Sequence, residues 1–429
     1  MQILFITYYF PPRRAIACVR TSALCTGLLK AGHNVHVVTS CGSPPLADVA
    51  GDMFNRDCTQ GGRLRVSRVR SWWHDLHDGP GVRRAKGLLD KVWAVFARVV
   101  GISLSLIGFD EAVPWALAAW AAVDPDVPYD CVLVSAGPFS TLFTGYALAR
   151  SNGLPLILDY RDVWNDSPHT AVRCSTRWLE RILLARSALV VSVSPSCLKS
   201  IVGDSKVPGI VITNGISEDV SRVSRVMHPS QPTSLVYAGA FYPPKRSFKP
   251  IAAALQLLRS RHPASPPIAF SYFGPSSTYV EEVAQQHGVE NLVHAFGPVS
   301  RHEAMVAQAD SLCTVVVTST ERTCSLADRG IVTGKLFEAI ALAPWVLVIS
   351  PLDSDVRSLT ASLPHVKHFH GEQTQAIANW LDEIASAAIE PRSADYWKNL
   401  AWPHLADHFS EQIDFAVRQW RSPYASRLA

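Results

Sequence analysis

The stretch GIVTGKLFEAIA, residues 330–341, is the most informative part of this chain, because it is typical of a glycine-rich turn that leads into a helix. Lys335 and Glu338 are three positions apart and therefore share one helical face. Glycines let a ligand approach the backbone, and a helix amino terminus offers unpaired N–H groups and a partial positive charge. The stretch predicts an anion site, with a diphosphate beside Lys335 and ribose hydroxyls donating to Glu338.

The same residues have a second interpretation. An ordinary α/β turn capped by Thr333 would leave Lys335 solvated and Glu338 in a surface ion pair, and such sequences are common where a strand leads into a helix.

Composition narrows the class of protein. A chain of 429 residues exceeds what one hydrophobic core usually supports, which predicts two domains. The apolar share of 48% and the net charge of +4 fit a globular protein and argue against a dedicated nucleic-acid binder. The nine cysteines form no CxxC pair, so they are interpreted as buried residues or free thiols of a reducing compartment.

The amino terminus runs directly into a strand pattern and shows no secretory signal. The apolar window 92–123 is interrupted by Arg98, Asp110, Glu111 and Pro114, so it falls short of the roughly 20 apolar residues of a membrane span. We expect a cytoplasmic protein, with peripheral attachment to the inner face of the cell membrane as a further expectation.

Apolar β-branched runs alternate with helical patterns along the chain, which predicts two doubly wound parallel α/β domains. Predicted strands are 3–10, 34–40, 64–70, 131–136, 154–160, 189–193 and 210–213, then 235–240, 268–273, 292–296, 312–317 and 346–349. Helices are predicted at 18–31, 139–151, 176–187, 250–259, 279–287, 301–308, 334–341 and 396–420.

Several well-known motifs are missing. The turn after the first predicted strand reads YYFPPRRA at 8–15, where a dinucleotide-binding domain would have GxGxxG. The sequence also has no P-loop, no GxSxG nucleophile turn and no His/Cys cluster at zinc spacing. We therefore expect no cofactor and no metal.

A series of short motifs resembles the retaining glycosyltransferases of family 4, most closely the branch used in polysaccharide and capsule assembly. The likeness covers nearly the whole chain, and it rests on the order and spacing of these motifs. The matching segments are FPP at 10–12, LKAGHNV at 29–35, DYRDVW at 159–164, TNG at 213–215, VYAG at 236–239, FG at 273–274 and 296–297, and residues 333–341.

This resemblance implies the GT-B fold, in which two Rossmann-like domains face a cleft. Residues 1–216 would be the acceptor-binding domain, 217–233 a linker, 234–395 the domain that binds a UDP- or GDP-sugar, and 396–429 helices that cross back to the first domain. The acceptor would be a saccharide, a lipid-linked molecule or a small molecule.

The resemblance also assigns donor-site residues. Lys245, with Arg246 beside it, falls where the family binds the diphosphate after the glycine of VYAG, Gly239, while the family's arginine directly after that glycine is Ala240 here. Thr333 and Gly334 would bind the donor at the helix start.

The family carries two glutamates with seven residues between them. The second corresponds to Glu338, expected on the donor ribose, whereas the first falls at Gly330; Asp328 stands nearby.

On the acceptor side, Arg161 and Asp162 follow the strand 154–160, where family members place cleft-facing polar residues. A structural salt bridge at the strand end is the alternative. Arg13 and Arg14 lie in the loop expected to face acceptor or phosphates, with a solvated loop as the alternative.

The implied reaction proceeds with retention and front-face attack, with Lys245, Arg246, Lys335 and Asp162 as the catalytic group. Cations aimed at the leaving phosphate lower the barrier, since charge builds there in the transition state.

Residues 63–98 interleave basic and aromatic side chains, which suits an anionic membrane surface as partner. A solvated helical face is the alternative interpretation.

Two other functions remain open at this point. One is a nucleotide-sugar epimerase of the same architecture. The other is a catalytically degenerate protein that binds a nucleotide sugar without turnover, as Ala240 and Gly330 suggest.

Overall fold

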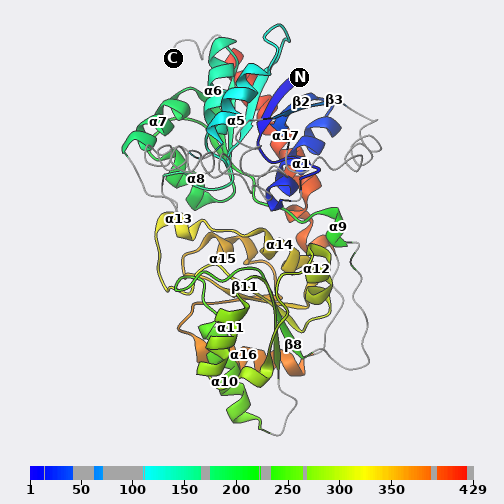
Figure 1. The fold of residues 1–429 in the computed structure, drawn as a ribbon, viewed down its shortest axis with the longest axis vertical. Coiled ribbons are helices and arrows are strands. Elements are labelled where there is room, and N and C mark those ends of the chain that lie inside the picture. The colour runs from blue at the N-terminus through cyan, green and yellow to red at the C-terminus, as the bar shows by residue number, and fades with distance from the viewer. Residues whose placement is uncertain are drawn as a thin grey trace, which may run out of the picture. The chain divides into compact units, whose positions relative to one another are not determined.

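The computed structural model describes residues 1–13, 15–41, 62–70, 110, 112–165, 174–221, 223, 233–263, 268–387 and 394–422. The chain divides into two compact units, the first formed by Met1–Thr213 with Trp402–Ala429, and the second by Asn214–Ala401. Each unit is a parallel sheet with helices packed on both faces (Figure 1).

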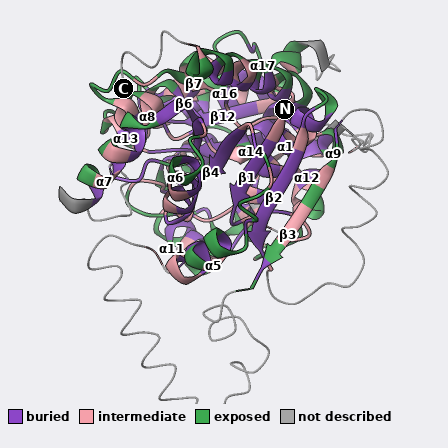
Figure 2. Ribbon diagram, turned by 90° about the horizontal axis from the view of Figure 1, so that it is seen from above, coloured by how far each residue is buried: buried purple, intermediate pink, exposed green. Residues whose placement is uncertain are grey.

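The sheet of the first unit has the strand order β3-β2-β1-β4-β5-β6-β7, and every pairing within it is parallel. The order reverses between β1 and β4, the topological switch point of the sheet. Figure 2 shows β1 and β2 buried, whereas β3 at the edge is largely intermediate or exposed. The strands are β1 (Gln2–Thr7), β2 (Asn34–Ser40), β3 (Leu64–Val69), β4 (Cys131–Ser135), β5 (Leu156–Tyr160), β6 (Ser187–Ser192) and β7 (Gly209–Val211).

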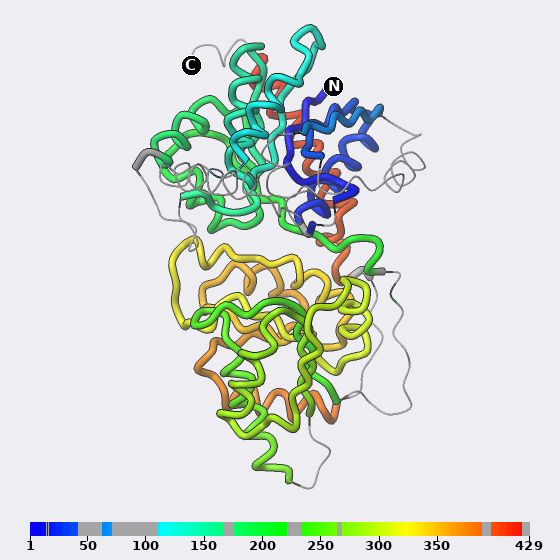
Figure 3. The backbone as a smooth tube through the Cα atoms, in the orientation of Figure 1, coloured from blue at the N-terminus to red at the C-terminus, as the bar shows by residue number. Residues whose placement is uncertain are grey.

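Helices of the first unit come from both ends of the chain. Figure 3 shows the C-terminal segment beside the N-terminal one, and α17 packs on α1. The two helices approach closely because Gly27 has no side chain: a Cβ there would lie 2.4 Å from the Cβ of Ala406. The helices are α1 (Ile16–Lys30), α5 (Val113–Ala121), α6 (Thr141–Ser151), α7 (Cys174–Ala185), α8 (Pro195–Val202) and α17 (Trp402–Arg421).

The apolar side of α17 explains why this helix packs there. Buried residues recur every three or four positions, so they form one stripe on a helix whose other face is polar. They join the core formed by α1 and the inner strands. The stripe comprises Trp402, Ala406, Phe409, Ile413 and Val417.

The sheet of the second unit has the order β10-β9-β8-β11-β12-β13 and is also parallel, with its switch point between β8 and β11. Apart from the edge strand β13, its strands are mostly apolar, as expected for a sheet covered on both faces. They are β8 (Ser234–Ala238), β9 (Ala269–Phe273), β10 (Val293–Ala295), β11 (Cys313–Val317), β12 (Trp345–Ile349) and β13 (Val366–Phe369).

Two cores cover the faces of this second sheet. Helices α10, α11 and α16 supply one core, and α9, α12, α14 and α15 supply the other. The helices are α9 (Glu218–Ser221), α10 (Lys249–Arg261), α11 (Ser277–Gln286), α12 (Arg301–Ala309), α13 (Leu326–Arg329), α14 (Gly334–Leu342), α15 (Asp355–Thr360) and α16 (Thr374–Ser386), with 3-10 turns at Glu290–Leu292 and Ala394–Leu400.

The expected fold class of two doubly wound α/β units is confirmed, and each predicted strand begins within two residues of the observed one. The first strand ends at Thr7 rather than residue 10, because the chain turns before Pro11 and Pro12. None of the described helices has the length and apolar character needed to cross a bilayer.

Candidate active site

The carboxyl ends of β8 and β11 form the switch point of the second unit, which is where open α/β sheets bind ligands. Gly239 directly follows β8, and Thr318 directly follows β11. The residues predicted for the donor site lie around these two positions.

Gly239 and Lys335 are in direct contact. The backbone of Gly239 has a φ of +139°, and a Cβ added there would lie 1.5 Å from Nζ of Lys335. The same ammonium lies 5.6 Å from the centroid of the buried Tyr237 ring. A side chain at this position would therefore displace the end of the lysine side chain.

The surroundings of Lys335 make its charge costly to hold. Burial of the ammonium lowers the pKa of Lys335, the neighbouring Arg246 lowers it further, and Glu338 opposes the shift. Arg246 donates from Nε to the carbonyl oxygen of Thr318 at 3.1 Å. Two cations thus face the same position beyond β8 and β11, and an anion bound there would relieve their repulsion.

Lys245 is engaged differently. Its ammonium lies 2.7 Å from Oδ2 of Asp328, and this bond raises the pKa of Lys245. The Asp328 carboxylate is 4% exposed and also accepts from Ser325 Oγ at 2.8 Å. Asp328, near the position of the family's first glutamate at Gly330, therefore pairs with the lysine predicted to bind the diphosphate.

Unpartnered hydroxyls accompany these cations. The Oγ1 of Thr333 is buried and has no hydrogen-bond partner among the described residues, and Thr318 Oγ1 and Ser350 Oγ are in the same situation. Thr333 precedes α14 in extended conformation, but its side chain makes no capping bond, so the capping part of the alternative interpretation is wrong. Buried hydroxyls without partners are costly, and a bound ligand would satisfy them.

Sequence reasoning missed Thr318 and Ser350. Each directly follows an apolar strand, β11 or β12, and a hydroxyl residue in that position is the signal that marks them.

Glu338 forms the ion pair that the alternative interpretation proposed. Its Oε1 accepts from Arg301 Nε at 2.7 Å, and Arg301 also donates to Asp219 and Ser217. A carboxylate offers about four lone-pair positions, so this contact does not exhaust its capacity to accept hydroxyl donors.

Aromatic side chains lie at the same edge of the sheet. Phe273 ends β9, and Phe296 follows β10. Their rings stack with centroids 4.9 Å apart, and Phe296 is 59% exposed. An exposed flat ring at a ligand edge suits a planar ligand group.

In the first unit, Arg161 and Arg13 meet at the switch point between β1 and β4. Their guanidinium groups lie 5.5 and 4.8 Å from the centroid of the Tyr9 ring. Arg161 also donates to the carbonyl oxygens of Ala136, at 2.8 Å, and Gly137.

Burial lowers the pKa of Arg161, and no ion pair joins it to the exposed Asp162, both of which lie in the described part of the chain. The structural salt bridge that was the alternative at this strand end therefore does not form between these two residues. Arg14 lies outside the described residues.

A buried ion pair near this edge was not foreseen. Arg20 on α1 binds the Asp159 carboxylate at 2.6 Å, and the two side chains are 2% and 0% exposed. Arg20 also donates to the carbonyls of Ile212 and Thr213, and Ser135 donates to Asp159. An arginine in an otherwise apolar helix and an aspartate inside an apolar strand were the available signals.

Comparison with known proteins shows which family and which fold the chain resembles. Residues 19–220 match the family described as Glycosyltransferase Family 4. This part of the chain, slightly less than half of it, is similar to glycosyltransferase family 4. The two-unit architecture is that of GT-B glycosyltransferases, so the expectations of that fold and of a glycosyltransferase are confirmed.

Solved structures support the fold over the whole length. Sucrose-phosphate synthase from Thermosynechococcus elongatus aligns with a TM-score of 0.58 at 14% identity, covering 100% of this chain and 99% of its own. An α,α-trehalose-phosphate synthase (UDP-forming) from Burkholderia vietnamiensis gives 0.57 at 12% identity, covering 98% and 100%.

The lipopolysaccharide outer core galactosyltransferase WaaB gives a TM-score of 0.55 at 11% identity, covering 97% and 99%. No curated protein matches the sequence. Within the described residues, no three His, Cys, Asp or Glu side chains gather as a metal site would require.

Proposed function

We propose that this glycosyltransferase moves a sugar from a UDP- or GDP-sugar to an acceptor, with retention of the anomeric configuration and without a metal ion. The observation that carries the proposal is the contact of Lys335 with Gly239 at the start of α14. It supports a diphosphate site at the switch point of the second unit.

The leaving diphosphate is the group that needs stabilisation. When the anomeric C–O bond breaks, negative charge builds on the phosphate oxygen, and preorganised cations and N–H groups lower that barrier. Lys335, Arg246 and the amides at the start of α14 supply them, with Thr333 donating from its unpartnered hydroxyl. Lys245, held by Asp328, would contact the outer phosphate oxygens.

The nucleoside would extend along the same edge of the second unit. Ribose hydroxyls would donate to the Glu338 carboxylate, and the base would stack on the exposed face of Phe296. The trehalose-phosphate synthase of the same fold is UDP-forming, which agrees with a nucleoside diphosphate product.

The acceptor would bind at the switch point of the first unit, beside Arg161 and Arg13, with Arg14 and Asp162 as further acceptor-side residues. In a retaining front-face reaction, the acceptor hydroxyl attacks the anomeric carbon and the leaving phosphate takes its proton. Saccharide, lipid-linked and small-molecule acceptors remain the candidates.

A donor screen tests this proposal. Thermal unfolding is measured with a panel of UDP- and GDP-sugars, and products are then analysed with the donor that raises the melting temperature most. We expect one nucleotide class to stabilise the protein and to be hydrolysed or transferred with release of the nucleoside diphosphate.

Two outcomes would contradict transfer. Isomerisation of the donor sugar without nucleotide release would indicate the epimerase, and stabilisation without any turnover across a panel of acceptors would indicate the degenerate binding protein.

A further inference from the structure

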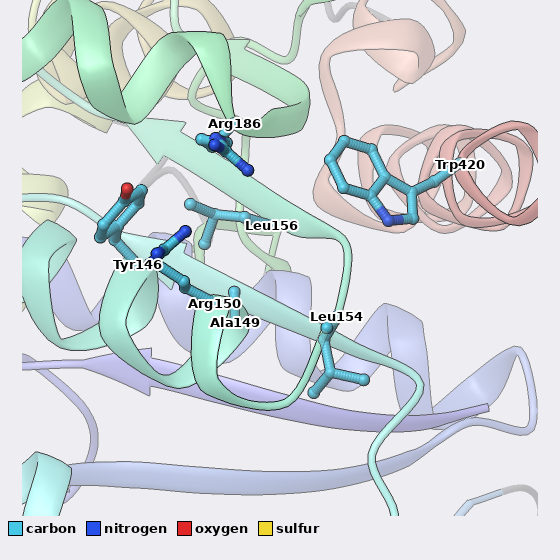
Figure 4. Close-up of a pocket in the computed structure, with 8 residues that line it drawn as sticks. Tyr146, Ala149, Arg150, Leu154, Leu156, Arg186 and Trp420 are labelled. Carbon is cyan, nitrogen blue, oxygen red and sulfur yellow. The ribbon is translucent and has the colours of Figure 1, made fainter. Parts of the chain in front are cut away.

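A shallow pocket of about 140 Å³ lies in the first unit, away from the candidate site. Figure 4 shows the side chains around it. Tyr146 and Arg150 come from α6, Leu154 from the loop before β5, Leu156 from the first position of β5, Arg186 from the residue before β6, and Trp420 from α17.

The pocket lies at the amino-terminal edge of the sheet. Leu156 is the first residue of β5, whereas Arg161 follows the last, so the five-residue strand separates the two places by roughly 16 Å. The proposed acceptor site occupies the carboxyl edge, and the pocket is therefore a separate place on this unit.

Two arginines give the pocket an unbalanced positive charge. Among the described residues, the guanidinium groups of Arg150 and Arg186 and the hydroxyl of Tyr146 have no hydrogen-bond or ion-pair partner. None of the residues lining the pocket carries a carboxylate. Both arginines are exposed, and guanidinium groups bind carboxylates and phosphates through paired N–H donors, so the pair suits an anionic ligand.

Arg150 is not needed to cap its helix. The last carbonyls of α6 accept instead from Asn152, whose Nδ2 donates to Leu148 at 2.9 Å and whose backbone N–H also bonds there. The side chain of Arg150 is therefore available to a ligand.

The rest of the pocket is apolar and aromatic. Leu154 and Leu156 form its floor, and Trp420 is 37% exposed beside it. An indole face packs well against the apolar C–H face of a pyranose ring, while Tyr146 and the arginines can bond the ring hydroxyls. A simple inorganic anion would leave this apolar surface uncovered.

We propose that this pocket binds an acidic sugar, a pyranose that carries a carboxylate or a phosphate, separately from the donor and acceptor of the transfer reaction. The anionic group pairs with Arg150 and Arg186, and the ring stacks on Trp420. The small volume fits one ring rather than a drug-sized ligand, whose pockets are about 300–1,000 Å³.

Binding is measured by calorimetric titration with methyl glucuronide and glucose 6-phosphate, with saturating UDP and GDP present to occupy the nucleotide site. Methyl glucoside and inorganic phosphate are the matched neutral and ring-free probes. We expect both acidic sugars to bind at least about tenfold more tightly than either control, because each lacks one of the two interactions.

Variants assign the binding to this pocket. The double variant Arg150→Gln and Arg186→Gln should lose about tenfold or more in affinity for the acidic sugars. Trp420→Ala should weaken binding of the acidic sugars but leave binding of inorganic phosphate unchanged. Trp420→Phe should keep most of the affinity for the acidic sugars. Arg181→Gln, an exposed arginine of α7 outside the pocket, should have no effect.

Three results would overturn the proposal. If methyl glucoside binds as tightly as the acidic sugars, the pocket does not recognise the anionic group. If inorganic phosphate binds as tightly as they do, the pocket does not recognise the sugar ring. Binding of phosphatidylglycerol vesicles through the same arginines, with no competition from acidic sugars, would make the pocket a lipid site. Melting temperatures of all variants show whether the fold is kept.

Discussion

The ammonium of Lys335 occupies the space that a side chain would take at Gly239. A Cβ at that glycine would lie 1.5 Å from Nζ, although the two residues belong to different elements, the end of β8 and the first turn of α14. The backbone of Gly239 and the Tyr237 ring thus fix the position of the cation that we assign to the leaving diphosphate.

Gly239→Ala should therefore act through Lys335. The new methyl group would displace the ammonium from the diphosphate site, and loss of one such stabilising group typically lowers kcat by about 10²–10³. Steady-state kinetics with a verified donor measure the loss.

Gly288→Ala is the matched control for backbone strain. Gly288 also has a positive φ, +64°, but a Cβ there would meet no atom within 4 Å. Both variants should lose roughly 1–2 kcal/mol of stability from the left-handed conformation, and only Gly239→Ala should lose activity. Equal kinetic effects would show that strain, not Lys335, explains the result.

Nucleoside diphosphate affinity should fall at alkaline pH. The diphosphate binds the protonated lysine, and burial and Arg246 lower the pKa of Lys335 from its usual 10.5. The charge is therefore present below the lowered pKa and is lost as pH rises through it, at a lower pH than for an exposed lysine.

Calorimetric titration of the nucleoside diphosphate from neutral to alkaline pH tests this expected loss of affinity. Lys335→Arg keeps its charge at these pH values, so its affinity should be flat where that of the unmodified protein declines. Parallel declines in both proteins would assign the titration to the nucleotide or to another group.

Glu338→Ala should lower the affinity for nucleotides by roughly 10–100-fold, because the ribose hydrogen bonds are lost. The affinity for inorganic pyrophosphate should stay unchanged, since pyrophosphate has no ribose. Arg301→Ala is the control, since it breaks the same ion pair but keeps the carboxylate. If Arg301→Ala weakens nucleotide binding as much as Glu338→Ala does, the carboxylate acts by positioning α12 and α14 and does not contact ribose.

Membrane binding stays a prediction from sequence. Residues 71–98 of the basic and aromatic stretch lie outside the described residues, while Arg65 and Arg68 on the edge strand β3 and Arg63 just before it are exposed. Each basic residue near an anionic surface contributes about 1 kcal/mol, so charge reversal at Arg83, Arg84 and Lys86 should reduce co-sedimentation with anionic liposomes at low salt. Binding that is unchanged by this reversal, or equal on neutral liposomes, would refute the assignment.

The fold was largely predictable because its signals are local. The strand at Asn34–Ser40 is rich in β-branched residues, and its bounds were predicted correctly. The strand β13 was missed, because Val366–Phe369 is only four residues long and half polar, a pattern that period-two reasoning cannot separate from a loop.

The site was less predictable, because its contacts join distant segments. Sequence motifs placed Gly239 and Lys335 in one site but did not show that one excludes a side chain for the other. They also gave no sign that Asp328 holds Lys245, because ion pairs between separate loops follow from tertiary packing and have no sequence period.

The most direct test of the account is product analysis with the best nucleotide sugar, comparing the unmodified protein with Lys335→Ala. The account predicts a glycoside that retains the donor's anomeric configuration, formed in step with nucleoside diphosphate, and a loss of about 10²–10³ in kcat for the variant with an unchanged melting temperature. An inverted product, or a variant that transfers sugar at the normal rate, would contradict it.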